Sequence, residues 1–326
     1  METFRYISIF LEDKILIFLN ILLLLVGFVL LIKGADFFVD GSLSIAKLLK
    51  IPSVVIGLTI VAMGTSAPEA AVSISAALQG SNEIAVSNVV GSNIFNMLAV
   101  VGVCALISPM PLDRNIVKRD FPVNIVATVV LLALVLLGNS LGRIDGAVML
   151  ALMIAYISWL VVAAIKNREE GSDNIKTMSP ILSVVCIIGG LAAIIFGGNL
   201  VVENAKAIAS AAGLSETFIG LTIVAIGTSL PELVTSIVAS KKGENGLALG
   251  NVVGSNIFNL LLILGLSSAV TPIAIDTASI INIIFVMIIT VLMWILCLFT
   301  KKIGRIPGAV MVALYIAYTT YLVIQG

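Results

Sequence analysis

Two polar segments of this chain occur twice, at one fixed separation. Gly57–Glu69 reads GLTIVAMGTSAPE and Gly220–Glu232 reads GLTIVAIGTSLPE, while Ser87–Met97 (SNVVGSNIFNM) is matched by Gly250–Leu260 (GNVVGSNIFNL), in each case 163 residues apart. Each copy places a glutamate, hydroxyls and amides inside apolar sequence, where an ionisable group is costly and by default marks an ion or substrate pathway. The repeat therefore predicts a buried acidic site that is built twice.

The composition places the chain in a lipid bilayer. Hydrophobic residues make up 60% and charged residues 11%, and the apolar runs are long enough to cross a hydrocarbon core of about 30 Å as helices of about 20 residues. With 18 acidic and 18 basic residues the formal charge is zero, which disfavours nucleic acid as a partner. Histidine is absent, which removes imidazole as a metal ligand and proton shuttle. The isolated Cys104, Cys186 and Cys297 are interpreted as small buried residues.

The apolar runs predict an all-α membrane protein with ten transmembrane helices, near 14–38, 42–79, 83–108, 116–138, 143–166, 178–203, 206–241, 245–270, 277–300 and 306–325. The polar stretch Lys166–Met178 (KNREEGSDNIKTM) separates the two copies. We therefore expect a first five-helix repeat at 1–166, a linker at 167–177 and a second repeat at 178–326. Asp36, Asp40 and Glu203 fall at predicted span ends and are interpreted as interfacial.

Five helices per repeat is an odd number, so the second repeat enters the membrane with the opposite orientation. Inverted repeats of this kind recur in secondary transporters that bind substrate near the midplane. The positive-inside rule places both termini outside, because thirteen basic residues then fall in inner segments and four in outer ones. The inner residues are Lys47, Lys50, Arg114, Lys118, Arg119, Lys166, Arg168, Lys176, Lys241, Lys242, Lys301, Lys302 and Arg305. The amino-terminal segment lacks the features of a cleaved signal peptide, and we expect a multi-pass protein of the cell membrane.

The repeated motif predicts an interrupted helix lined by oxygen atoms. Pro68 and Pro231 have no amide hydrogen, so each kinks or opens its helix next to a glutamate. Irregular backbone at membrane depth is tolerated only against protein or a wet cavity. Residues four apart share a helix face, and this spacing joins Thr65 to Glu69, Thr228 to Glu232, Ser92 to Asn96 and Ser255 to Asn259.

The predicted site consists of hard oxygen ligands. Carboxylate, carbonyl, hydroxyl and amide oxygens suit calcium, which takes 6–8 oxygens at about 2.3–2.6 Å, and also sodium, whereas copper and zinc prefer nitrogen and sulfur. Magnesium loses its water reluctantly and fits less well. We expect calcium and sodium as transported ions, no cofactor, the lipid bilayer as environment and a monomer as the functional unit. Gly57, Gly91, Gly220 and Gly254 are interpreted as close helix contacts.

The GTSAPE and GTSLPE segments, each followed by GSNIFN, resemble the α-repeats of the sodium/calcium exchanger family, of prokaryotic type, within the calcium/cation antiporter superfamily. The resemblance spans essentially the whole chain. It implies that Glu69 and Glu232 are central carboxylates shared by calcium and sodium, and that the remaining ligands are Thr65, Thr228, Ala62, Ala225, Ser92, Ser255, Asn96 and Asn259. Members of the family usually exchange three sodium ions for one calcium ion, which implies electrogenic transport.

The chain departs from the family pattern at one central position. Exchangers of this family often carry aspartate where Asn259 stands, and the potassium-dependent branch resembles that acidic pattern. A neutral amide therefore favours potassium-independent exchange and removes a possible protonation site. Proton-coupled exchangers of the superfamily usually carry a GNxxE motif in place of GTSxPE. Proton/calcium exchange is the first alternative.

Two other classes of protein are weighed against exchange. A passive cation channel also uses acidic rings, but a sodium gradient would not drive calcium uphill through it. A membrane-embedded hydrolase is disfavoured because the chain has no histidine and no nucleophile with an evident base. For a single copy of the motif, a packing kink with a paired acid would be an equally good interpretation, and the duplication favours the ion site.

Overall fold

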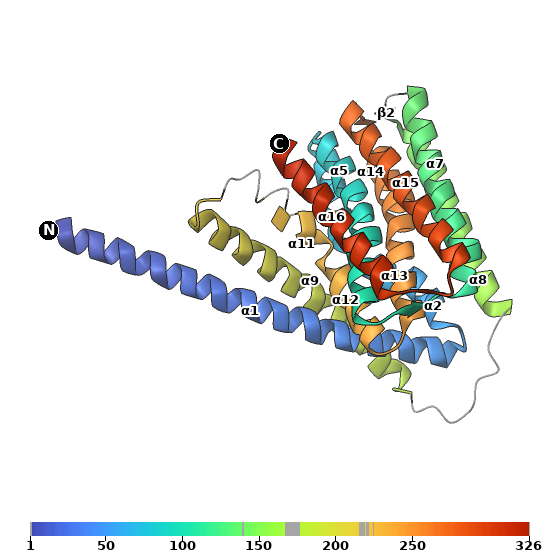
Figure 1. Cartoon of the computed structure of the whole chain (residues 1–326), viewed down its shortest axis with the longest axis horizontal. Helices are drawn as coiled ribbons and strands as arrows, with labels where there is room; N and C mark the ends of the chain where they lie inside the picture. The colour runs from blue at the N-terminus through green and yellow to red at the C-terminus, as the bar shows by residue number, and fades with distance from the viewer. Residues whose placement is uncertain are drawn as a thin grey trace.

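The computed structural model describes residues 2–138, 140–166, 177–214, 219, 222–223 and 225–325. Nearly all of them are helical, and the helices lie side by side in one bundle from which the first helix projects (Figure 1). The predicted linker at 167–177 lies outside the described residues except for Thr177.

The first half of the chain contains a very long helix, a broken helix and three further spans. Segments labelled η are short π-helical stretches within or beside an α-helix. The elements are α1 (Glu2–Leu49), α2 (Ser53–Ile56), η1 (Gly57–Val61), α3 (Ala62–Thr65), α4 (Ala67–Leu78), α5 (Asn82–Phe95), η2 (Asn96–Val100), α6 (Val101–Ile107), β1 (Met110–Pro111), η3 (Ile116–Asp120), α7 (Phe121–Gly138), β2 (Ser140–Leu141) and α8 (Arg143–Lys166).

The second half repeats this order. Its elements are α9 (Pro180–Ala211), α11 (Ala225–Thr228), α12 (Leu230–Lys241), α13 (Asn245–Ile257), η5 (Phe258–Ile263), α14 (Leu264–Val270), β3 (Ile273–Ala274), α15 (Thr277–Phe299), β4 (Lys302–Ile303) and α16 (Arg305–Gln325). Within the described residues, eight helices are long and apolar enough to cross a membrane. The helix pair Ser53–Thr65 and Ala67–Leu78, bent by 48°, makes a ninth span if its two pieces cross the membrane together. The predicted span at 206–241 contains residues outside the described part, so the count of ten stays a prediction.

Two predicted helix boundaries are wrong. The apolar runs place the end of the first span near residue 38 and the start of the second near 42, but α1 runs unbroken to Leu49 and the next helix begins at Ser53. Likewise α9 continues past 203 to Ala211. Asp36 and Asp40 therefore lie inside α1 and not at its end, where their carboxylates are 3.5 and 2.6 Å from the ammonium of Lys242. The sequence around Asp36 and Asp40 resembles a loop because it is charged. The ion pair with Lys242 lets these residues stay within the helix.

The long helices α1 and α9 pack along a stripe of small residues. A β-carbon added at Gly34 would lie 2.8 Å from the Gly190 carbonyl oxygen, and one added at Gly190 would lie 2.6 Å from the Phe38 amide nitrogen. Only glycine permits backbones to approach this closely, which is how helices associate in a bilayer. Figure 1 shows α1 beside α9, and the C-terminal part of α1 also packs against α12 and α2.

The centre of the bundle is formed by the segments that carry the repeated motifs. Helix α13 is buried along its length and contacts η1, α2 and α12, while α5 contacts α4 and α15. Two short antiparallel ladders link the halves: β1 pairs with β4, with Met110 opposite Ile303, and β2 pairs with β3, with Leu141 opposite Ile273. The halves are therefore interlocked around the repeated motifs, which lie in the interior.

Candidate ion-binding site

Each repeated motif interrupts its helix one residue after the threonine. Ser66 ends α3 and begins α4 with φ −82° and ψ 7°, and Ser229 plays the same part before α12 with φ −93° and ψ 7°. Pro68 and Pro231 stand in the first turn of the new helix, where the missing amide hydrogen costs nothing. The prediction that the motif opens the helix is confirmed, and the break turns Ser66 and Ser229 toward the opposite half.

The carboxylate of Glu69 is fully buried and is contacted from both halves of the chain. Its Oε1 accepts hydrogen bonds from Ser229 Oγ at 2.9 Å and from Ser92 Oγ at 3.4 Å. The two serine oxygens are 3.0 Å apart. The Glu69 backbone carbonyl accepts from Asn88 Nδ2 at 3.2 Å. One serine from each repeat thus holds one oxygen of this carboxylate.

Glu232 repeats this arrangement with the halves exchanged. Its Oε1 accepts from Ser66 Oγ at 2.9 Å and from Ser255 Oγ at 3.4 Å, and its carbonyl accepts from Asn251 Nδ2 at 3.4 Å. Glu232 is also fully buried. Every one of these contacts of Glu69 to a serine or an asparagine therefore has a counterpart in the other repeat, so the geometry is two-fold symmetric at the level of hydrogen bonds.

Four asparagines lie between the two halves. Asn93 Nδ2 donates to the Asn256 carbonyl at 3.3 Å, and Asn256 Nδ2 donates to the Asn93 carbonyl at 3.2 Å. Asn96 Nδ2 donates to Asn256 Oδ1 at 3.0 Å and Asn259 Nδ2 to Asn93 Oδ1 at 3.1 Å. All four amides are buried. Their donors are used between the helices, which leaves the side-chain oxygens of Asn96 and Asn259 as the acceptors without a partner.

Four buried oxygens of this region lack a hydrogen-bond donor: Glu69 Oε2, Glu232 Oε2, Asn96 Oδ1 and Asn259 Oδ1. In the described part of the chain, ion pairs involve Arg119 and Lys242, and neither basic residue contacts a motif glutamate. The described part of the chain contains no cluster of three or more histidine, cysteine, aspartate or glutamate side chains that could hold a metal ion. The site therefore combines two carboxylates with neutral oxygens, a donor set suited to a hard cation.

The predicted threonine and alanine ligands lie near the two carboxylates. In this structure Thr65, Thr228 and the Ala62 carbonyl make hydrogen bonds to neighbouring residues. Thr65 Oγ1 contacts Asn251 Oδ1 at 3.0 Å and donates to the Val61 carbonyl at 3.1 Å, and Thr228 Oγ1 donates to Asn88 Oδ1 at 3.4 Å. The Ala62 carbonyl accepts from Ser255 Oγ at 3.5 Å. Ala225 begins α11.

Sequence reasoning missed the residues that join the halves, which are Ser66, Ser229, Asn88, Asn93, Asn251 and Asn256. The serines stand directly beside the predicted threonines, and their presence in both copies of the motif is the signal that could have found them. The expected pairing of residues four apart assumes an unbroken helix. Because the helices break at Ser66 and Ser229, the hydroxyl of each serine reaches the glutamate of the other repeat.

A cavity of about 340 Å³ leads to one side of this site. Its lining includes Asn88, Gly91, Ser92 and Thr228, together with Tyr318 of α16. The residues at the corresponding positions of the other repeat are buried: Ile84 in the cavity wall is 53% exposed, whereas Leu247 is 0% exposed. The site is therefore open on one side and sealed on the other.

The glycines show the same difference. A β-carbon added at Gly254 would lie 2.8 Å from the Ala62 β-carbon and 2.9 Å from the Leu58 α-carbon, whereas one added at Gly91 would meet nothing within 4 Å. The predicted close contacts at Gly254 and Gly57 are confirmed, since a β-carbon at Gly57 would lie 2.6 Å from the Leu247 carbonyl. The one at Gly91 is wrong in this conformation because Gly91 faces the cavity. Gly220 lies outside the described residues.

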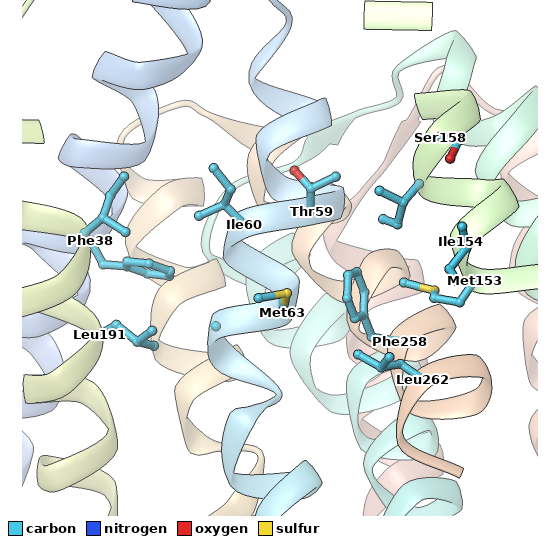
Figure 2. A pocket seen from close by; sticks show the side chains of 13 residues that line it. Phe38, Thr59, Ile60, Met63, Met153, Ile154, Ser158, Leu191, Phe258 and Leu262 are labelled. Carbon is cyan, nitrogen blue, oxygen red and sulfur yellow. The ribbon is translucent and has the colours of Figure 1, made fainter. Parts of the chain in front are cut away.

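A second cavity, of about 520 Å³, is almost entirely apolar (Figure 2). Phe38 and Leu191 line one side of it, and Met153 and Ile154 line the other. Among the described residues that line it, Thr59 and Ser158 carry a hydroxyl and the others do not. Such a surface cannot replace the hydration shell of an ion, so the smaller polar cavity is the candidate route to the carboxylates.

The fold and the site define a multi-pass membrane transporter. The family model described as sodium/calcium exchanger protein matches residues 19–162 and 182–324. The chain is 41% identical to CaxA of Alkalimonas amylolytica, a putative antiporter, over 313 residues, 90% of this chain and 95% of the relative. It is 35% identical over 347 residues to the sodium/calcium exchanger MaX1 of Methanosarcina acetivorans, covering 94% of this chain and 99% of MaX1.

Solved structures give the same result. The sodium-calcium exchanger NCX_Mj, soaked with 10 mM Na⁺ and no Ca²⁺, matches with a TM-score of 0.82 and 34% identity over 92% of this chain and 98% of that chain. The chain therefore belongs to the sodium/calcium exchanger family. At this level it is a cation antiporter and not an enzyme.

Proposed function

We propose that this protein exchanges sodium for calcium across a membrane by alternating access, with Glu69 and Glu232 as the shared carboxylates. The observation that carries the proposal is the set of four buried, unpartnered oxygens at Glu69, Glu232, Asn96 and Asn259. Hydroxyls of Ser92, Ser255, Thr65 and Thr228 and carbonyls of Ala62 and Ala225 complete the shells of the ions. This role is supported by the contacts that the serines, the threonines and Ala62 make around the two carboxylates.

The energetic reason is that two buried carboxylates need a counter-charge. An ionised carboxylate without a partner is very unfavourable away from water, and no basic residue of the described chain pairs with either one. One calcium ion balances both charges. Sodium has the same preference for oxygen, so sodium ions can replace calcium at the same oxygens, and the two ions compete for one site.

We also assign the architecture to two inverted five-helix repeats, 1–166 and 178–326, with both termini outside the cell membrane and a monomer as the transporting unit. The support is the reciprocity of contacts: Ser66 contacts Glu232, and Ser229 contacts Glu69. The ladders follow the same exchange, because β1 pairs with β4 and β2 with β3. Two related halves give one site two equivalent exits, of which the polar cavity is one.

Sodium-loaded proteoliposomes diluted into sodium-free medium with calcium test this function. With the membrane potential held at zero, we expect calcium to accumulate above its external concentration, and a sodium ionophore to abolish the accumulation. A proton gradient in place of the sodium gradient is expected to be ineffective. Equal calcium concentrations on both sides at the end point would indicate a channel, and accumulation driven only by protons would indicate the proton-coupled alternative.

The serines allow a test of how the two ions are distinguished. Ser92→Ala or Ser255→Ala removes a hydroxyl next to a carboxylate without changing the charge, so we expect the sodium concentration for half-maximal exchange to rise about tenfold, the order of one hydrogen bond to a charged group. Calcium binding is expected to change less, by under about threefold, because a divalent ion is held mainly by the carboxylates. Ser267→Ala, which removes a buried hydroxyl of α14, is the matched control. Equal losses for both ions would remove these serines from the sodium sites.

The charge count predicts a current. Three sodium ions that leave in exchange for one entering calcium ion move one net positive charge out of the vesicle, so an interior-positive potential should speed calcium uptake. At two to one the exchange would be electroneutral, and at one to one an interior-negative potential would speed it. Replacing potassium by choline without an ionophore should have no effect, because Asn259 adds no third negative charge. Uptake insensitive to potential, or stimulated by potassium alone, would contradict this assignment.

A further inference from the structure

A groove of about 380 Å³ lies between α7 and α8, outside the ion site. Its walls are apolar and include Pro122, Val123, Val126, Leu152 and Ala155, and its floor reaches Leu261. Three residues, Lys118, Arg119 and Trp159, line its rim. We refer to it as the α7–α8 groove. It combines an apolar slot with positive charge at one end.

The rim carries one net positive charge. Arg119 is held by Asp120, with Nε 2.7 Å from Oδ1 and Nη2 3.0 Å from Oδ2, and the buried Asp120 also accepts from the Tyr156 hydroxyl at 3.2 Å. Lys118 is exposed and makes no ion pair within the described residues. Asp120 thus neutralises Arg119, and the Lys118 ammonium is left to bind an anionic partner.

An aromatic ring completes the rim. The guanidinium carbon of Arg119 lies 5.8 Å from the centre of the Trp159 ring, and Trp159 is 50% exposed. Tryptophan prefers the level of the lipid headgroups, and basic residues beside a helix attract anionic lipids. The rim therefore stands at headgroup height, with the apolar slot running into the acyl-chain region.

The charge is a feature of this end alone. The repeats are offset by 163 residues before this segment and by 162 after it, which places residues from Ile280–Asn282 where Lys118 and Arg119 stand in the first repeat. The fold accordingly accepts uncharged residues at these positions. The two bases are therefore specific to the membrane surface that is rich in basic residues, where anionic lipids gather in the proposed topology.

We propose that the α7–α8 groove binds an anionic phospholipid, with the phosphate on Lys118 and an acyl chain against Val123, Val126 and Leu261. Charge complementarity selects this occupant over a zwitterionic lipid. Leu261 belongs to η5, the segment that also carries Asn259, so the bound lipid contacts the wall of the ion site. The proposal rests on the membrane topology and not on the identity of the exchanged ions.

Tryptophan quenching tests the proposal without using transport. The chain has 2 tryptophans, so Trp294→Phe leaves Trp159 as the single reporter. We expect brominated phosphatidylglycerol to quench it with about fivefold greater affinity than brominated phosphatidylcholine, the order expected for one basic residue near an anionic headgroup. Lys118→Gln should reduce this ratio to about one, and Lys47→Gln, at the end of α1, should leave it unchanged.

Three outcomes would overturn the assignment. These are equal quenching by both lipids, an unchanged preference in Lys118→Gln, and full competition by soluble glycerol phosphate, which would show that the rim takes a free phosphate without a lipid chain. Trp294 Nε1 donates to the Val117 carbonyl at 2.8 Å, so Trp294→Phe can impair folding. Native mass spectrometry of the unmodified protein and of Lys118→Gln with the same two lipids then makes the same comparison, and equal retention of both lipids contradicts the proposal.

Discussion

Replacing Glu69 or Glu232 by glutamine is expected to reduce sodium-driven calcium uptake at least about a hundredfold. The substitution keeps the side-chain volume and removes one of the two charges that oppose the divalent ion. Breaking a buried charge pair costs about 3–5 kcal/mol, which corresponds to a factor of about 10² to almost 10⁴ in binding. Each glutamate is buried and has one oxygen without a donor. Because a calcium ion needs both charges, the glutamate that remains in either variant cannot balance the ion alone.

Glu203→Gln is the matched control for this loss. Glu203 lies in α9, is exposed, and belongs to neither motif. Calcium uptake into proteoliposomes, normalised to the amount of inserted protein, should be near normal in this variant. Retention of more than about a third of the uptake by either E69Q or E232Q would place the ion elsewhere, because that loss is far smaller than a broken charge pair produces.

Alanine at two repeat-related glycines is expected to shift the access equilibrium in opposite directions. In the described conformation Gly254 is packed against Leu58 and Ala62, whereas Gly91 faces the open cavity. Overpacking costs about 1–3 kcal/mol, so Gly254→Ala should disfavour this conformation by a factor of about 5 to 150. Alternating access exchanges the two environments. Gly91→Ala should therefore leave this conformation intact and oppose closure of the cavity.

The labelling rate of a cysteine in the cavity measures this shift. Ser87 lines the cavity, and Ser87→Cys can be labelled there by a membrane-impermeant maleimide. Labelling should slow in Gly254→Ala and be unchanged or faster in Gly91→Ala, while both variants exchange more slowly. The reaction of the same variants without Ser87→Cys gives the background from Cys104, Cys186 and Cys297. A parallel change in both glycine variants would argue against two equivalent exits.

Much of the site was predictable because its sequence motif occurs in both halves of the chain. A duplicated glutamate beside proline, in apolar sequence, leaves few alternatives to an ion site, and both glutamates are indeed buried at the junction of the halves. The cross-contacts of Ser66 and Ser229 were not predictable from helix periodicity. They depend on the 48° bend measured in the first copy and on how one half faces the other.

The predicted boundaries of α1 and α9 were wrong because they, too, depend on contacts between residues far apart in the chain. Asp36, Asp40 and Gly41 resemble a turn when read alone, and a two-helix interpretation fits the local sequence. Their helical state depends on the close contact of α1 with α9 and on the ion pair to Lys242. Both are contacts between residues that are far apart in the chain, which single-sequence periodicity does not contain.

Anomalous diffraction from calcium-soaked crystals tests the central claim most directly. We predict one calcium peak between the two glutamates, about 2.3–2.6 Å from Glu69 Oε2 and Glu232 Oε2, with Asn96 Oδ1 and Asn259 Oδ1 facing it. High sodium should remove the peak, because sodium occupies the same oxygens. A calcium peak away from these carboxylates, or one that high sodium leaves unchanged, would contradict the assignment of a single site shared by both ions.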